Sequence, residues 1–270
     1  MTSTAEQHAF RRIVVTMGAS ESSSPVLETA VRLAAILGAE LEGVFVEDIN
    51  LIRLAELPFL REVRPWPFAE EALSSQRMQR ELRTMARQAE HMLEQAAAEL
   101  GVSCSFRVWR GRTEAASLTT AFEADVLSLG RISSRISRQS RIMPVPHRKA
   151  VQYTINSINV LFTDSVQAAR ALDAACHMAK NLGVQLNILL ADNKPDKEQA
   201  LKKKAGAILD ANALHALFII LNDVDIPSLA HTVNASGDSV LIAEAGHPLL
   251  QNESLDQCLE ALSCPLLLVR

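Results

Sequence analysis

The sequence predicts an α/β protein made of two tandem domains, each an open parallel β-sheet with flanking helices. The chain has 270 residues, which is enough for two domains of about 130 residues each. Hydrophobic residues make up 48% of the chain and aromatic residues only 4%, so Ala, Val, Leu and Ile must form most of the core. Apolar runs typical of buried strands alternate along the chain with segments of helical periodicity, which is the pattern of βαβ units.

The first predicted domain, residues 1–150, starts with an apolar run that is typical of a strand buried on both faces. A polar loop follows, and Pro25 then suits the first turn of a helix. Thr113 is a plausible cap for a later helix. The predicted elements are a strand at 13–17, a helix at 25–37, a strand at 41–46, a short helix at 50–56, a loop, a long helix at 69–100, a strand at 103–110, a helix at 113–123 and a strand at 126–129. An apolar stripe along the long helix contains Met78, Leu82, Met85, Ala89, Met92, Ala96 and Leu100.

The second predicted domain, residues 151–270, repeats this order at a separation of about 146 residues. Its predicted strands lie at 158–162, 184–190, 215–221, 240–243 and 265–269, and its predicted helices at 166–182, 197–210, 228–234 and 255–262. The first domain has no recognisable fifth strand, so its sheet is either truncated or completed by the other half. Residues 131–150 carry six Arg or Lys residues and few apolar positions, which indicates a basic loop and interdomain linker.

Composition excludes several classes of function. The net charge of −4 gives no general attraction to nucleic acid or to anionic lipid. No apolar run approaches the roughly 20 residues that a membrane-spanning helix needs. The four cysteines form no CxxC pair and lie at no metal-ligand spacing from a histidine, so we expect reduced thiols in a cytoplasmic protein. These cysteines are Cys104, Cys176, Cys258 and Cys264.

Four segments of the chain resemble the universal stress protein family in its tandem two-domain form. They read RRIVVTMGASESSSPVLETAVRLAAILGAEL, VFVED, ADVLSLGR and SCPLLLVR. The last segment is similar to the family's final strand, which begins with a Cys-Pro pair. The resemblance extends over nearly the whole chain and implies a Rossmann-like fold of the adenine nucleotide α-hydrolase type.

The resemblance also indicates where a nucleotide would bind. ATP-binding members of the family place an Asp after the first strand and a glycine-rich loop after the fourth, where backbone N–H groups approach phosphates. Asp164 matches the Asp in the second half, whereas Met17 and Gly18 stand at that position in the first half. Neither half keeps the loop, because Gly130 and Gly246 are each the only glycine where the family has three. No cofactor is therefore expected, although ATP remains a candidate.

The residues that would contact a nucleotide, if one binds, follow from the same resemblance. They are Val46, Gly130, Arg131, Asp164 and Gly246. Serines between residues 20 and 24 could hold a phosphate or only cap the following helix. The arginines of 131–149 could grip phosphate, bind an acidic partner or form a solvated linker. The seven histidines are scattered, without an HExxH motif, so no catalytic or metal-binding residue is predicted.

These patterns favour a non-catalytic stress-response or signalling protein with degenerate nucleotide-binding loops. It would act through an unidentified protein partner, either as a homodimer or as an internal pseudo-dimer. One alternative is a nucleotide-binding switch that uses Asp164, the strand end at 44–46 and the arginines. Another alternative is a slow ATPase or a nucleotidyl-transfer enzyme. The sequence leaves open whether the two sheets join into one body.

Overall fold

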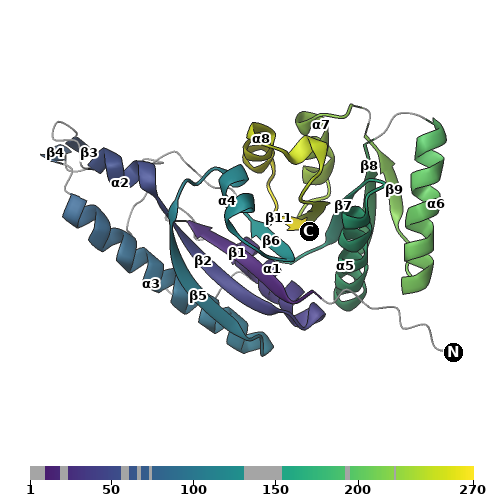
Figure 1. Cartoon of the computed structure of the whole chain (residues 1–270), viewed down its shortest axis with the longest axis horizontal. Coiled ribbons are helices and arrows are strands. Elements are labelled where there is room, and N and C mark those ends of the chain that lie inside the picture. Colours follow the sequence, from purple (N-terminus) through teal and green to yellow (C-terminus); the bar gives the residue numbers. More distant parts are fainter. Residues whose placement is uncertain are drawn as a thin grey trace.

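The computed structural model describes residues 10–18, 24–55, 61–65, 68–72, 75–130, 154–191, 195–221 and 223–270 (Figure 1). Its first half follows the predicted order of strands and helices except at 61–72, where two strands occur that were not predicted. The elements are β1 (Arg12–Gly18), α1 (Ser24–Leu37), β2 (Glu40–Asp48), α2 (Ile49–Ala55), β3 (Arg61–Pro65), β4 (Phe68–Ala72), α3 (Ser75–Leu100), β5 (Cys104–Gly111), α4 (Ala115–Ala121) and β6 (Val126–Leu129).

The second half contains five strands, as predicted, with helices between them. The elements are β7 (Ser157–Phe162), α5 (Val166–Leu182), β8 (Gln185–Leu190), α6 (Pro195–Asn212), β9 (Leu217–Ile220), α7 (Ile226–Asn234), β10 (Ser239–Glu244), a 3₁₀ turn η1 (Pro248–Leu250), α8 (Glu253–Ala261) and β11 (Leu266–Val269). Ser165 caps α5 by accepting a hydrogen bond from the Ala168 N–H at 2.8 Å, and Gly183 ends it with a φ of 66°.

One continuous sheet of nine strands runs through both halves, in the order β5-β2-β1-β6-β11-β10-β7-β8-β9. The strands of each half are parallel to one another, which confirms the predicted parallel sheets. The two sets meet where β11 pairs antiparallel with β6. The four described strands of the first sheet are therefore completed by the last strand of the other half, which answers one question that the sequence left open.

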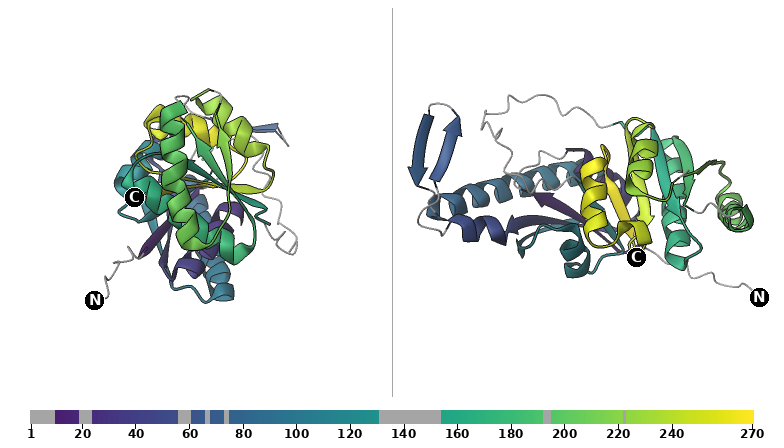
Figure 2. Two further views of the ribbon diagram at one scale, coloured as in Figure 1. Left: turned by 90° about the vertical axis from the view of Figure 1, so that its right-hand side faces the viewer. Right: turned by 90° about the horizontal axis from the view of Figure 1, so that it is seen from above.

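Helices cover both faces of this sheet (Figures 1 and 2). One face packs against α1, α3, α5 and α6, and the other against α4, α7 and α8. Along each buried strand, successive side chains enter opposite cores, which is the period of two expected for a strand. In β11, for example, Leu267 lies in the first core, whereas Leu266 and Leu268 lie in the second.

The predicted start of the long helix is wrong. Residues 61–72 contain an antiparallel hairpin, β3 paired with β4, and α3 begins only at Ser75. Pro65 favours extended backbone at the residue before it, Arg64, which suits the strand β3 better than a helical turn. The hairpin projects beyond the end of the sheet in Figure 2.

The predicted cap of α4 is also wrong. Its N-cap residue is Glu114, which makes no side-chain capping bond. The Thr113 hydroxyl instead donates to Asp48 at 3.4 Å.

The predicted apolar stripe of α3 is confirmed in part, because Leu82 and Ala89 are buried and Met78, Met85 and Ala96 pack against the core. The most buried line also includes Ala86, Leu93 and Ala97. Met92 and Leu100, which belonged to the predicted stripe, are 39% and 49% exposed. Close approach of α3 to β2 explains the difference, because a Cβ on Gly43 would lie 2.5 Å from Leu93 Cδ2. Leu93 therefore fills the space above a glycine, and the alanines of α3 let the helix lie close to the sheet.

Polar contacts also join the two halves across the β6/β11 seam. The Arg170 guanidinium of α5 lies 3.4 Å from the Asp125 carboxylate, and the Arg270 N–H donates to the Asp125 carbonyl at 3.0 Å. On the other face, the Asp256 carboxylate of α8 accepts a hydrogen bond of 2.8 Å from the Ala115 N–H at the start of α4. Burial raises the pKa of Asp256, so this carboxyl is held at the seam at a cost in desolvation.

Among the described residues, no helix is both long enough and apolar enough to cross a lipid bilayer. All four cysteines are free thiols, and only Cys104 is more than marginally exposed. Burial raises the pKa of the Cys258 thiol to about 12.

Candidate functional site

In the second half, the strand order marks the position at which open α/β sheets bind ligands. This position, here called the crevice, lies at the carboxyl ends of two neighbouring strands whose following helices cover opposite faces of the sheet. β7 and β10 are such neighbours, because α5 follows β7 on one face and α8 follows β10 on the other. The sequence places Thr163, Asp164 and Ser165 after β7, and Glu244 at the end of β10.

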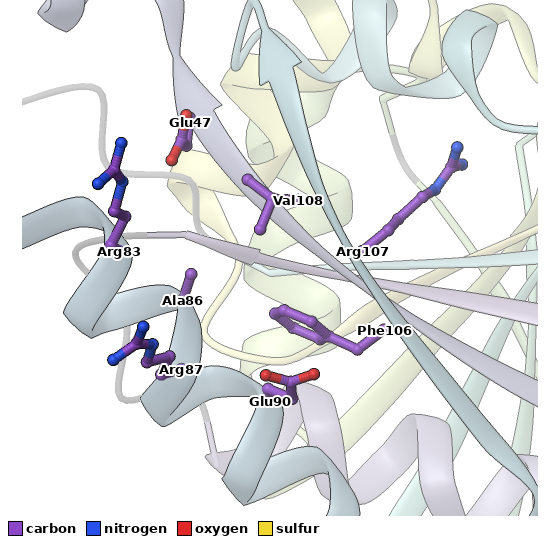
Figure 3. Close-up of a pocket in the computed structure, with 8 residues that line it drawn as sticks. All are labelled: Glu47, Arg83, Ala86, Arg87, Glu90, Phe106, Arg107 and Val108. Atoms are coloured by element: carbon purple, nitrogen blue, oxygen red, sulfur yellow. The ribbon is translucent and has the colours of Figure 1, made fainter. Parts of the chain in front are cut away.

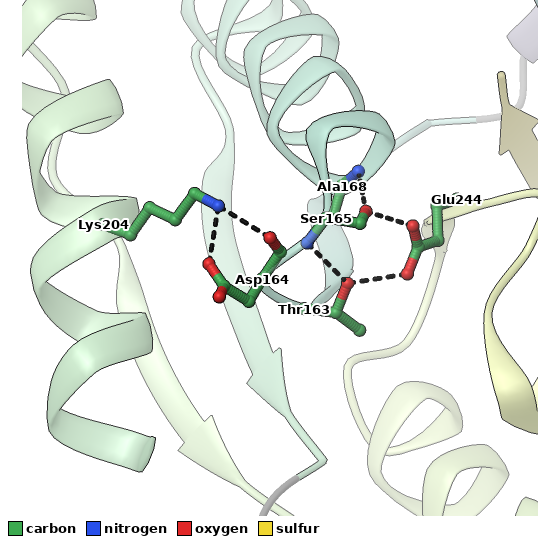
Figure 4. A network of polar contacts seen from close by, with 6 residues as sticks. All are labelled: Thr163, Asp164, Ser165, Ala168, Lys204 and Glu244. Atoms are coloured by element: carbon green, nitrogen blue, oxygen red, sulfur yellow. Dashed lines mark hydrogen bonds and ion pairs between the residues drawn. The ribbon is translucent and has the colours of Figure 1, made fainter. Parts of the chain in front are cut away.

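A carboxylate of the chain itself occupies this crevice. Glu244 is only 6% exposed and accepts hydrogen bonds from two hydroxyl groups of the β7–α5 loop (Figure 4). The Thr163 hydroxyl donates to Glu244 Oε1 at 2.6 Å, and the Ser165 hydroxyl donates to Oε2. Since Ser165 also caps α5, the negative charge lies one hydroxyl group away from the helix N-terminus. A helix N-terminus favours an anion, and here the anion is Glu244.

Asp164 points away from this network. Its side chain is 84% exposed, and Lys204 of α6 donates to its carboxylate at 2.6 Å and to its carbonyl at 2.7 Å. Figure 4 shows Lys204 and Glu244 on opposite sides of the loop. The residue that matches the family's nucleotide-contacting Asp is therefore engaged in a surface ion pair, which contributes little to stability.

The loop after β10 has no structural requirement for its glycine. A Cβ on Gly246 would meet no atom within 4 Å, and its φ is not positive. His247 follows it, is 3% exposed, and accepts the Leu249 N–H at its Nδ1 at 3.1 Å. Burial lowers the pKa of His247, an effect that the Glu244 charge partly opposes. A neutral, buried imidazole and the Pro248 turn thus close the loop where a phosphate loop would need open backbone N–H groups.

The predicted residues of the first half do not form a comparable cluster in the described part of the chain. Val46 is 4% exposed, and its side chain packs in the core on the α4 side of the sheet. Gly130 follows β6 and is buried. Arg131, the serines at 20, 22 and 23, and the other basic residues of 131–149 lie outside the described residues.

The structure does not bring the predicted switch residues together. Because β6 and β11 are antiparallel, the strands of the two halves point in opposite directions. The carboxyl ends of the first-half strands therefore lie on the side of the sheet where the second-half strands begin. Asp164 lies at the carboxyl end of β7, and residues 44–46 lie toward the carboxyl end of β2, on the opposite side. A single site that contains both is therefore excluded.

Sequence reasoning missed Glu244, Thr163 and Lys204. A glutamate that ends the apolar run SVLIAE was a weak signal, because a buried carboxylate needs partners. Its partners come from a strand about 80 residues earlier in the chain, which only the strand order reveals. No group of three or more potential metal ligands occurs among the residues described.

Comparisons with known proteins agree with this architecture. A universal stress protein from Archaeoglobus fulgidus DSM 4304 matches with a TM-score of 0.55 and 12% sequence identity, covering 96% of each chain. A protein from Pseudomonas aeruginosa UCBPP-PA14, described as a universal stress protein, matches with a TM-score of 0.50 and 12% identity, covering 97% of this chain and 93% of its own. No protein-family model matches the sequence, and no curated protein matches it. The chain thus has the fold of these universal stress proteins, which confirms the resemblance at the level of fold.

Proposed function

We propose that this chain is a non-catalytic stress-response protein of the universal stress protein type, in which the ligand crevice of the second half is closed by Glu244. It would act in the cytoplasm through contacts with a protein partner rather than through nucleotide turnover. The paired halves would serve as an internal dimer. The observation that carries the proposal is the Glu244 carboxylate between the Thr163 and Ser165 hydroxyls.

Coulomb's law gives the repulsion between the Glu244 carboxylate and a bound phosphate. Two unit negative charges about 4 Å apart repel by about 4 kcal/mol at an effective dielectric constant near 20. That repulsion lowers affinity by about a thousandfold. A phosphate would also have to displace Glu244 from two hydrogen bonds, which leaves a buried charge without partners.

Calorimetry with ATP and with inorganic phosphate tests this proposal. The wild-type protein is expected to show no binding below millimolar concentrations. Glu244→Gln keeps the shape and removes the charge, so it is expected to bind either anion at least tenfold more tightly than the wild type. Glu253→Gln is the matched control, because Glu253 is an exposed glutamate at the start of α8 and lies outside the network.

Three results would contradict the proposal. The first is micromolar ATP affinity in the wild type, or nucleotide released when the purified protein is denatured, either of which would favour the nucleotide-binding switch. The second is phosphate release from ATP that Asp164→Ala abolishes, which would favour the enzyme. Equal affinities of the wild type and Glu244→Gln for ATP would show that Glu244 does not block the crevice.

A further inference from the structure

A groove runs between α3 and the edge strand β5, away from the crevice described above (Figure 3). Its volume is about 310 Å³. Ala86, Phe106 and Val108 form an apolar floor, and Val108 is 48% exposed. Arg83 and Arg87 stand on successive turns of α3 along the groove.

These two arginines have no direct ion-pair partner among the described residues, although the carboxylate of Glu90 also lines the groove. Neither forms an ion pair or hydrogen bond with any residue in the described parts of the chain. The nearby carboxylate of Glu47 is already held by Arg110, whose guanidinium donates to it at 2.9 and 3.0 Å. Like charges four residues apart destabilise a helix slightly, so the pair does not serve the stability of α3.

The strand beside the groove also has an unpaired edge. β5 is the outermost strand of the nine-stranded sheet, and among the described residues its one strand neighbour is β2. The Ser103 carbonyl accepts the Leu41 N–H of β2 at 3.0 Å, and the direction of backbone groups alternates along a strand. The N–H and C=O groups of Phe106, Val108 and Arg110 therefore point outward. The arginines of the same stretch are each paired within the chain, Arg107 with Glu42, Arg110 with Glu47 and Arg112 with Glu114, so Arg83 and Arg87 are the cations along the described part of the groove that remain for a partner.

We propose that β5 accepts an acidic, extended segment of a partner protein as a tenth strand, with its carboxylates paired to Arg83 and Arg87. Strand addition to an open edge obtains affinity from main-chain hydrogen bonds and specificity from alternate side chains. On the α3 side of the sheet, acidic side chains of the added segment would face the two arginines, and its apolar side chains would lie on the opposite side, beside Trp109. Figure 3 shows Arg107 directed away from the groove, and its guanidinium is paired with Glu42 at 2.8 Å, so the proposal does not depend on it.

Fluorescence anisotropy with a labelled peptide that alternates valine and glutamate over eight residues, the length of β5, tests the proposal. We expect saturable binding that weakens with added salt. Arg83→Glu combined with Arg87→Glu should weaken it by about tenfold or more. Arg80→Glu is the matched control, because Arg80 is an exposed arginine of α3 that does not line the groove.

Val108→Pro separates strand addition from simple charge attraction. Proline removes an outward N–H and should leave the hydrogen bonds to β2 in place, so the fold is retained while strand addition is blocked. Val108→Ala controls for the lost side chain and is expected to bind more tightly than Val108→Pro. Circular dichroism checks that each variant is folded.

Several outcomes would overturn the proposal. They are no saturable peptide binding, equal binding of a peptide with lysine in place of glutamate, and full binding by folded Val108→Pro. Binding of inorganic phosphate or ATP that requires Arg83 and Arg87, without peptide binding, would assign the groove to a small anion instead. None of these measurements involves Glu244, so failure here leaves the proposed state of the crevice untouched.

Discussion

Replacing Leu267 by alanine tests whether the two halves unfold as one unit. Leu267 is fully buried in β11, opposite Ser128 of β6 on one side and Ile242 of β10 on the other. Removal of such a buried leucine side chain costs about 3 kcal/mol of unfolding free energy. For a chain of this size the melting temperature should fall by roughly 6 to 12 °C.

The tryptophans make the two halves distinguishable in this experiment. Both occur in the first half of the sequence, and Trp109 of β5 packs edge-on against Phe122 at 5.4 Å. Tryptophan fluorescence therefore reports the first half, whereas circular dichroism at 222 nm reports the whole chain. Because β11 is shared across the seam, Leu267→Ala is expected to lower both transitions by the same amount.

Separate transitions would refute this reasoning. If the fluorescence midpoint of Leu267→Ala stays at the wild-type value while circular dichroism shows an earlier step, the halves unfold independently and β11 stabilises only its own side. Leu217→Ala is the control, because Leu217 is 56% exposed on the edge strand β9. That change should alter unfolding free energy by less than about 0.5 kcal/mol.

Two further predictions concern single positions. Burial raises the pKa of Asp256 in the folded state, so its contribution to stability is greatest at low pH and is lost as pH rises through that pKa. In Asp256→Asn, the side-chain Oδ1 can still accept the Ala115 N–H. In urea titrations this variant should be at least as stable as the wild type at pH 7, with a smaller advantage at pH 4. Marked destabilisation at pH 7 would contradict this. Gly43→Ala should lower the unfolding free energy by about 1 to 3 kcal/mol, because the new Cβ meets Leu93. The Cβ of Gly246→Ala meets no atom, so that variant should keep the stability of the wild type. Equal effects of the two substitutions in thermal melts would disprove this account.

The sequence predicts most elements of the fold because each depends on neighbouring residues. The apolar run at 13–17, the stop at Gly183 and the Cys-Pro pair before 266–269 are local signals, and the structure confirms the strands and helices that they indicate. The register of α3 was less predictable. Its buried line depends on the glycine at 43, which belongs to a strand more than 30 residues earlier.

The candidate site could be predicted only in part, for a similar reason. Asp164 is recognisable because it directly follows a buried strand. The closing group, Glu244, acquires its role only when β10 lies beside β7, and Lys204 acquires its role only when α6 packs near the β7–α5 loop. Side chains that meet across more than 40 residues leave no periodic pattern in the sequence.

The single shared strand also explains why the two halves differ in composition. In the second half, α8 and β11 follow β10, and the corresponding stretch of the first half is 131–150. β6 already has β1 on one side and β11 on the other, so neither of its edges is open to a fifth strand of its own. A further apolar strand directly after β6 would therefore find neither edge of β6 open. This arrangement removes one structural reason for an apolar sequence at 131–149, which is consistent with the six Arg or Lys residues of that segment.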